Sequence, residues 1–220
     1  YMQNLNKQPV IILGGFLINP DSYIPISNWL KKNYQINSEI VNVNKLEWLK
    51  TSSESGWINI LDKVDSLVQR AKSNSSTGKV SLIGHSSGGV MLRLYLANNL
   101  LERREYDGKR NCNNLITLGS PNQAIRATKL RAKVSNIIPG AYFQEVNYAS
   151  ICGELNLKSN KATLFSKIFS KYSYKSISGL SETSGDGLVP ICSALLDNSN
   201  QIVLSNVAHG YFFGKNWYGS

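Results

Sequence analysis

Six short apolar runs, each ended by a glycine or a polar turn, recur along the chain. Several are almost continuously apolar, which is typical of strands that are covered on both faces, as in a parallel sheet. The predicted strands are residues 9–15, 38–43, 79–84, 114–120, 175–179 and 201–205.

Helical patterns lie between these runs. Residues 21–34 begin with an aspartate suited to cap a helix, and residues 57–73 carry apolar side chains at spacings of three and four. A third helix is predicted over residues 88–101. Strands that alternate with helices predict an α/β fold, with a mostly parallel central sheet flanked by helices and joined by right-handed crossovers.

Residues 121–174 interrupt this alternation, because a single helix would be enough to connect two strands. A segment this long predicts an insertion that acts as a cap or lid. One helical face within it is apolar and has Lys161, Lys167 and Lys171 beside it. Such a face contacts an acyl chain or a membrane, or it packs on its own domain, which is the commoner case. The apolar face comprises Leu164, Phe165, Ile168, Phe169 and Tyr172.

Length and composition fit one globular domain over residues 1–220, since 42% of the residues are hydrophobic. No apolar run approaches the ~20 residues that span a bilayer. The sequence also lacks a signal-peptide pattern at its start. Cys112, Cys152 and Cys192 are odd in number and widely spaced, which predicts free thiols and a cytoplasmic location.

Basic residues are concentrated in one quarter of the chain. The net charge is +10, and residues 121–175 contain nine lysines and arginines against two acids. No helix-turn-helix, zinc-finger or aromatic RNA-binding pattern accompanies them, so we expect no nucleic-acid partner. The remaining interpretations are an anionic membrane surface, an anionic substrate or a solvated basic face.

The stretch "KVSLIGHSSGGVMLRLYL", residues 79–96, contains the pattern G-x-S-x-G with Ser86 at its centre. A strand that turns at once into a helix forces this serine into a strained conformation and exposes its hydroxyl at the helix N-terminus. Ser87 occupies the variable position before the second glycine. The sequence therefore predicts Ser86 as a nucleophile, because a strand precedes it and a helix follows.

A serine hydroxyl needs a base, and the chain has only two histidines. His85 is held beside Ser86 in the turn, so His209, in a loop after the last predicted strand, is the candidate base. Asp186, in "SGDGLVP", is the candidate acid that orients this histidine. Glu182 is a nearby alternative, and Asp197 is less well placed.

Acyl transfer also needs donors for the developing oxyanion. The backbone N–H of Ser87, directly after the nucleophile, is one candidate. The other is the N–H of Phe16 in the "GGFL" loop after the first strand, with Leu17 as the alternative. The candidate substrate-binding side chains are those of Leu17, Leu164, Phe165 and Ile168.

These motifs together resemble α/β-hydrolases of the lipase and esterase group. The matching stretches are "LGGF", "GHSSGG", "LITLGSP", "GDGLVPICSALL" and "VAHG", which span Gly14 to Gly210 in order. The chain is most similar to the subgroup that includes lecithin–cholesterol acyltransferase and glycosylphosphatidylinositol deacylases. It departs from this group at Gly14 and Asn122, where relatives often have histidine.

The resemblance implies the α/β-hydrolase fold and hydrolysis of carboxylic esters, often of lipids, without a cofactor or metal. The expected enzyme is a serine lipase or esterase that acts on a small-molecule or lipid ester through Ser86, His209 and Asp186, with peripheral contact to an anionic membrane. An acyltransferase or thioesterase would use the same triad. A non-catalytic binding module on the same fold is the third alternative.

Overall fold

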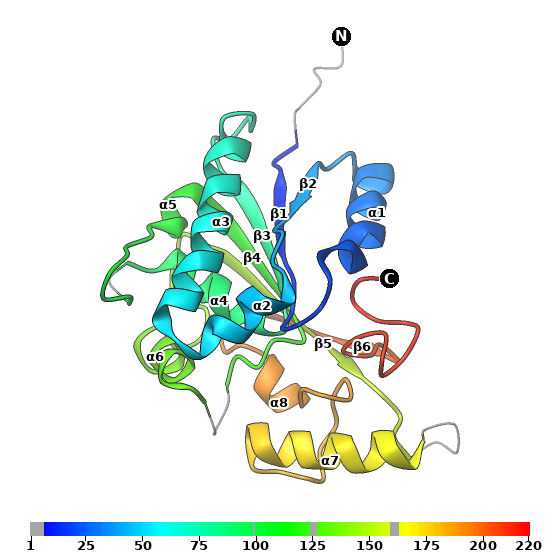
Figure 1. The fold of residues 1–220 in the computed structure, drawn as a ribbon. Helices are drawn as coiled ribbons and strands as arrows, with labels where there is room; N and C mark the ends of the chain where they lie inside the picture. Colours follow the sequence, from blue (N-terminus) through cyan, green and yellow to red (C-terminus); the bar gives the residue numbers. More distant parts are fainter. Residues whose placement is uncertain (1–6, 99, 124–126, 159–162) are drawn as a thin grey trace.

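Over the residues that the structure describes, a sheet of six strands forms the centre of the protein (Figure 1). The structure is a computed structural model that describes residues 7–98, 100–123, 127–158 and 163–220. The strands follow the order β2-β1-β3-β4-β5-β6, and every neighbouring pair is parallel. They are β1 (Val10–Leu13), β2 (Ser38–Ile40), β3 (Val80–His85), β4 (Cys112–Leu118), β5 (Asn147–Glu154) and β6 (Asn200–Ser205).

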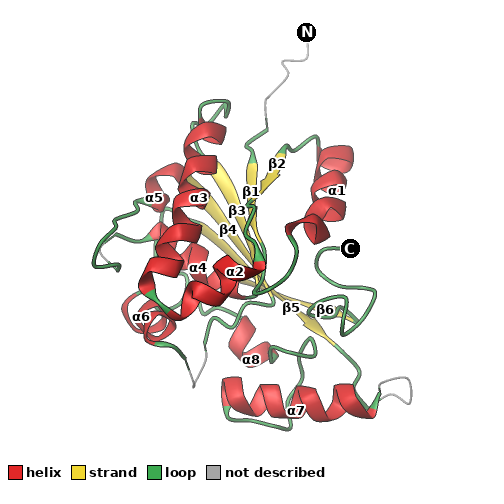
Figure 2. Cartoon of the chain, viewed as in Figure 1, coloured by secondary structure: helices red, strands yellow, loops and turns green. Residues whose placement is uncertain are grey.

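Helices cover both faces of this sheet (Figure 2). The α-helices are α1 (Ile24–Tyr34), α2 (Lys45–Leu49), α3 (Glu54–Lys72), α4 (Ser87–Leu96), α5 (Gly108–Asn111), α6 (Lys129–Ile137), α7 (Leu164–Ser178) and α8 (Ile191–Ala194). Two short 3-10 helices, η1 (Pro20–Tyr23) and η2 (Lys50–Ser52), precede α1 and α3. This alternation confirms the predicted α/β class.

The core has two layers, one on each side of the sheet. On one side, Leu82 and Leu115 pack in a cluster with buried side chains of α3 and α4. On the other side, Ile12 and Ile83 pack with Tyr23 and Trp217, which come from η1 and the C-terminal segment. Because all strands are parallel, the loops after β1, β3 and β6 leave the sheet at the same edge, and this edge carries the candidate site.

The prediction of a strand at 175–179 is wrong, because these residues form the end of α7. Thr163 caps the start of α7 by accepting a hydrogen bond from the Ser166 N–H, and Gly179 ends the helix with a left-handed φ of 79°. Glycine adopts this conformation without a steric penalty, so it suits the end of a helix. The helical pattern of apolar residues that begins at Leu164 therefore extends to the end of the helix, before Gly179.

The segment 121–174 is not a single insertion over the sheet. It contains α6, most of α7 and the strand β5, which pairs with β4 on one side and β6 on the other. The sequence "NYASICGE" has small and polar residues where the other inner strands are apolar, so hydrophobic patterning did not reveal it. The segment therefore belongs to the regular strand–helix alternation.

The remaining sequence features have simple structural counterparts. Cys112 and Cys152 are buried, Cys192 is exposed, and all three are free thiols. Within the described ranges, no helix combines the length and the apolar character needed to cross a membrane.

Candidate active site

Ser86 lies in a tight turn between β3 and α4. Its backbone has φ 53° and ψ −125°, a strained conformation for a residue with a side chain. The turn is held against the sheet because the Ser86 N–H donates a hydrogen bond to the Leu118 carbonyl at 2.9 Å. A Cβ atom on Gly84 would lie 2.4 Å from the Cα of Gly89, so the strand and helix approach this closely only with glycine there. The local sequence thus forces the Ser86 hydroxyl out of the turn.

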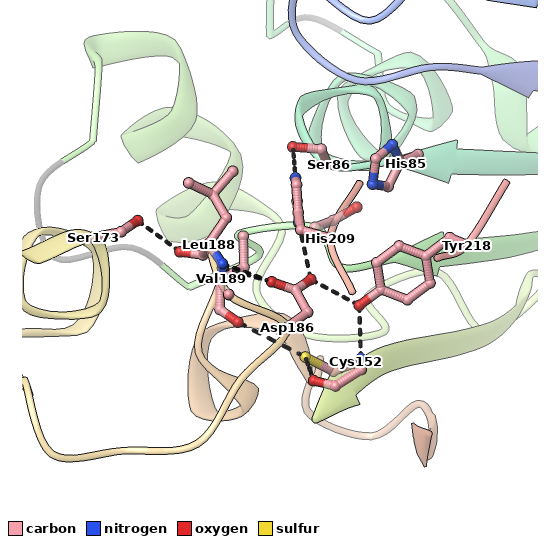
Figure 3. Close-up of polar contacts among 12 residues, drawn as sticks. His85, Ser86, Cys152, Ser173, Asp186, Leu188, Val189, His209 and Tyr218 are labelled. Atoms are coloured by element: carbon pink, nitrogen blue, oxygen red, sulfur yellow. Dashed lines mark hydrogen bonds and ion pairs between the residues drawn. The ribbon is translucent and has the colours of Figure 1, made fainter. Parts of the chain in front are cut away.

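The structure brings the three side chains of the predicted triad together, as Figure 3 shows. The Nε2 atom of His209 lies 3.0 Å from the Ser86 Oγ, and its Nδ1 atom lies 2.9 Å from the Asp186 Oδ2. All three residues are buried, with Asp186 fully enclosed. The backbone N–H of His209 also donates to the Asp186 carbonyl at 2.8 Å, so main chain and side chain fix the pair together.

The Asp186 carboxylate is stabilised by four groups. Its Oδ1 accepts the N–H groups of Leu188 at 3.1 Å and Val189 at 2.8 Å. Its Oδ2 contacts His209 and accepts the hydroxyl of Tyr218 at 2.7 Å. A buried carboxylate needs such donors, because burial removes its water. The arrangement can hold the His209 ring in one orientation.

The two alternative acids lie elsewhere. Glu182 is exposed and forms an ion pair with Lys171 at 2.6 Å. Asp197 is also exposed, and its carbonyl accepts the Ala141 N–H. The structure therefore places Asp186, and neither alternative, beside His209.

Tyr218 is a site residue that sequence reasoning missed. Its hydroxyl donates to Asp186 and accepts the Gly153 N–H at 2.6 Å, at the end of β5. Burial and the nearby Asp186 charge raise the pKa of Tyr218, so it remains a protonated donor. It lies in an irregular segment after His209, and no motif marks it.

His85 supports the neighbouring loop instead of serving as the base. Its Nδ1 lies 2.7 Å from the Tyr23 hydroxyl, which in turn accepts the Gly15 N–H at 2.8 Å. Burial, followed by the nearby His209, lowers the pKa of His85 well below its usual value. The ring is therefore neutral and holds η1 against the loop that contains Phe16.

The two predicted oxyanion donors border the same cavity. A Cβ on Gly15 would lie 2.9 Å from the Ser86 Cβ, so the loop after β1 packs closely against Ser86. Leu17 has a positive φ of 61°, and the Ile18 N–H donates to the Gly15 carbonyl, which closes the loop. Among the described residues, the N–H groups of Phe16 and Ser87 have no protein acceptor. Both are free to bind a substrate oxygen.

A cavity of about 680 Å³ opens at Ser86. Its walls are mainly aromatic and aliphatic. Among the described residues that line it, Arg131 is the only lysine, arginine, aspartate or glutamate. Four predicted substrate-binding residues do not line it: Leu17, Leu164, Phe165 and Ile168 are exposed. Sequence reasoning missed the actual walls, which include Trp48, Trp57, Met91, Ile177, Phe212, Phe213 and Trp217.

The described residues contain no group of three or more histidine, cysteine, aspartate or glutamate side chains that could hold a metal ion. The chemistry that the site can support with its own residues is nucleophilic attack by a serine, with a histidine as base and two amides as oxyanion donors.

Comparison with known proteins relates this arrangement to a family. The family model described as palmitoyl protein thioesterase matches residues 9–178, which is most of the chain. The match includes Ser86 and ends before Asp186 and His209. No curated protein matches the chain significantly.

The comparison with solved structures finds matches at low sequence identity. The crystal structure of the gene lin2722 products from Listeria innocua has a TM-score of 0.51 and 13% identity, and the match covers 91% of this chain and 83% of that one. Est1E from Butyrivibrio proteoclasticus has a TM-score of 0.48 and 12% identity, over 94% of this chain and 82% of that one. The parallel sheet with its flanking helices is an α/β-hydrolase fold.

The contacts of Tyr218 give a testable prediction. Tyr218→Phe removes one of the donors that hold Asp186, so His209 is oriented less firmly. We expect a fluorophosphonate probe to label Ser86 about tenfold more slowly, the order of effect of a charge-assisted hydrogen bond.

Tyr95→Phe is the matched control, because the buried Tyr95 hydroxyl donates to the Asp65 carboxylate at 2.7 Å and lies outside the cavity lining. Both variants should lose about 1–2 kcal/mol of unfolding free energy. Equal labelling rates in the two variants would contradict a positioning role for Tyr218.

Proposed function

The chain belongs to the palmitoyl protein thioesterase family, and we propose that it is a serine hydrolase that cleaves acyl thioesters and esters through Ser86, His209 and Asp186. At the coarser level it is an α/β-hydrolase of the ester- and thioester-cleaving class. The observation that carries the proposal is the continuous relay from the Ser86 Oγ through His209 to Asp186, at 3.0 Å and 2.9 Å. The likeness to lecithin–cholesterol acyltransferase and the deacylases stays a prediction.

In the proposed reaction, the Ser86 oxygen attacks the acyl carbonyl while His209 Nε2 takes its proton. The carbonyl oxygen becomes negative, and the N–H groups of Phe16 and Ser87 stabilise it. His209 then donates the proton to the departing thiol or alcohol, which leaves an acyl-enzyme. Water, activated by the same histidine, releases the acid and restores Ser86.

The cavity supports an apolar acyl group as the substrate. Its volume of about 680 Å³ falls within the usual size of small-molecule pockets. Trp48, Trp57 and Met91 form a wall that an alkyl chain can contact without leaving a polar group unpaired. The family's description favours a thioester over an oxygen ester as the preferred substrate.

We further propose that the enzyme meets lipid-bound substrates at an anionic membrane. An exposed apolar surface, here called the aromatic rim, joins α7 to the loop after His209: the Phe165 and Phe212 rings meet edge to face at 6.0 Å. Tyr211 and Phe212 also line the cavity, so this surface reaches its opening. Lysines 167, 171 and 175 lie along the same helix. The aromatic rim comprises Leu164, Phe165, Ile168, Tyr172, Tyr211 and Phe212.

The assignment of the nucleophile has a direct test. Ser86→Ala should lower turnover of a neutral acyl thioester by ~10⁴ or more, because the attacking oxygen is lost. Ser87→Ala should keep most of the turnover, since its backbone N–H remains. Release of free thiol measures both rates, and equal losses would refute the assignment.

The membrane proposal is tested by co-sedimentation with vesicles. We expect the chain to bind vesicles of phosphatidylcholine and phosphatidylserine, and to bind pure phosphatidylcholine more weakly, since anionic lipid attracts lysines. Replacing Leu164 and Ile168 by serine should lower binding about tenfold or more, because two apolar side chains no longer enter the interface.

Trp29→Ser is the control, because Trp29 is an exposed apolar residue on α1, outside the aromatic rim. The membrane proposal is contradicted if the chain binds neither kind of vesicle, or if Trp29→Ser lowers vesicle binding as much as the double replacement does. Neither result would affect the hydrolase proposal.

A further inference from the structure

Arg131 lies beside the nucleophile, at the wall of the apolar cavity. It belongs to α6, and its Nη2 donates a hydrogen bond to the Ser87 Oγ at 2.7 Å. Ser86 and Ser87 are consecutive, so their Cα atoms are about 3.8 Å apart. A group held by this guanidinium is therefore close to the carbonyl that Ser86 attacks.

The charge of Arg131 has no counter-ion in the part of the chain that the structure describes. None of the ion pairs there involves it, although surface arginines such as Arg70 and Arg104 are paired with acids. Burial lowers the pKa of Arg131, which measures the cost of holding its charge away from water. The guanidinium stays protonated in proteins, so an anion from outside the chain would offset that cost.

A structural role does not account for this arginine. Arg93 shows what such a role looks like, because its guanidinium is fully buried and donates to the carbonyls of Asn122 and Ile138. The Arg131 guanidinium instead makes a single hydrogen bond among the described residues, to the Ser87 side chain. Its remaining N–H donors are available at the cavity wall.

The position also favours an anion for a second reason. Ser87 is the first residue of α4, a helix of ten residues whose N-terminus points at the site. Helix N-termini carry partial positive charge and unpaired N–H groups. The guanidinium and the helix thus add to the same positive potential beside Ser86.

We propose that Arg131 binds a carboxylate or phosphate on the leaving group of the substrate. This inference rests on the proposed function. The acyl chain occupies the apolar part of the cavity, where no charged group could be satisfied, and the anion on the thiol or alcohol side contacts Arg131. The enzyme would therefore prefer acyl thioesters of anionic thiols over neutral ones.

The test compares thioesters that share the octanoyl group and differ in the charge of the leaving thiol. The probes are S-octanoyl-3-mercaptopropionate, its neutral primary amide and S-octanoyl-2-mercaptoethyl phosphate, with free thiol as the readout. For the unmodified protein, kcat/KM should be about 10- to 100-fold higher for an anionic probe than for the neutral one, as expected of hydrogen bonds to a charged group. The carboxylate and phosphate arms distinguish the two anions.

Arg131→Met should remove this preference, so that the ratio of kcat/KM for the anionic probes to that for the neutral probe falls to about one. Arg131→Lys should retain part of it, because lysine keeps the charge but not the planar donors. Lys129→Met, on the same helix but outside the cavity lining, removes one positive charge as a control and should keep the preference.

Each outcome separates the two hypotheses. The anion site is refuted if the unmodified protein cleaves the neutral probe but shows no preference for the anionic ones. It is also refuted if Arg131→Met lowers kcat/KM by the same factor for every probe. In both cases the proposed hydrolase function is unaffected. If no probe is cleaved at all and Ser86 does not react with a fluorophosphonate, the proposed function fails and the inference fails with it. Thermal unfolding of each variant shows whether it is folded.

Discussion

The tight passage of β3 into α4 through Ser86 is the constraint on which the rest of the site depends. A serine with φ 53° is strained, and the strain persists because the surroundings leave no alternative. The Leu118 carbonyl holds the Ser86 N–H, and Gly84 and Gly89 let the strand and helix backbones nearly touch. In this conformation the Ser86 hydroxyl lies 3.0 Å from the His209 Nε2. The fold thus holds backbone strain at the position where the proposed nucleophile meets its proposed base.

A second constraint is the burial of the Asp186 charge. The carboxylate is fully enclosed, and its donors come from three separate parts of the chain: its own turn, the loop after β6 and Tyr218 near the end of the sequence. Such a network is stable only when every member is satisfied. This explains why the residues after His209 fold back against β5, where Tyr218 also accepts the Gly153 N–H.

Much of this site could be predicted from the sequence because its chemistry is local or scarce. The turn at Ser86 has a motif, and only two histidines were available for the base. Asp186 lies beside His209 as the sequence predicts, although the strand expected before it is the end of α7. The loop that carries Asp186 precedes β6 whether those residues form a strand or a helix. By contrast, the sequence analysis did not predict β5. This strand consists largely of small and polar residues, whereas a hydrophobic pattern identifies strands by their large apolar residues.

The cavity was beyond prediction for a related reason. Its walls are drawn from α2, α3, α4 and the loop after His209, which meet only through the tertiary fold. The apolar face of α7 was visible in the sequence, yet its outermost residues Leu164 and Ile168 face solvent. Arg131 could be seen as one of nine basic residues, but a sequence does not show which of them lines the cavity beside Ser87. That distinction needs the contacts of the folded chain.

His209 and part of the cavity wall lie in one short loop, which links substrate binding to catalysis in the proposed reaction. Gly210, Tyr211, Phe212 and Phe213 directly follow His209 and line the cavity, and the Phe213 N–H closes a turn onto the Gly210 carbonyl at 2.9 Å. In the proposed reaction, an acyl chain that packs against these rings also contacts the segment that carries the imidazole. The His209 N–H bond to the Asp186 carbonyl anchors this loop at its first residue. The proposed acyl chain would therefore contact a loop whose position is already fixed at the residue that carries the imidazole.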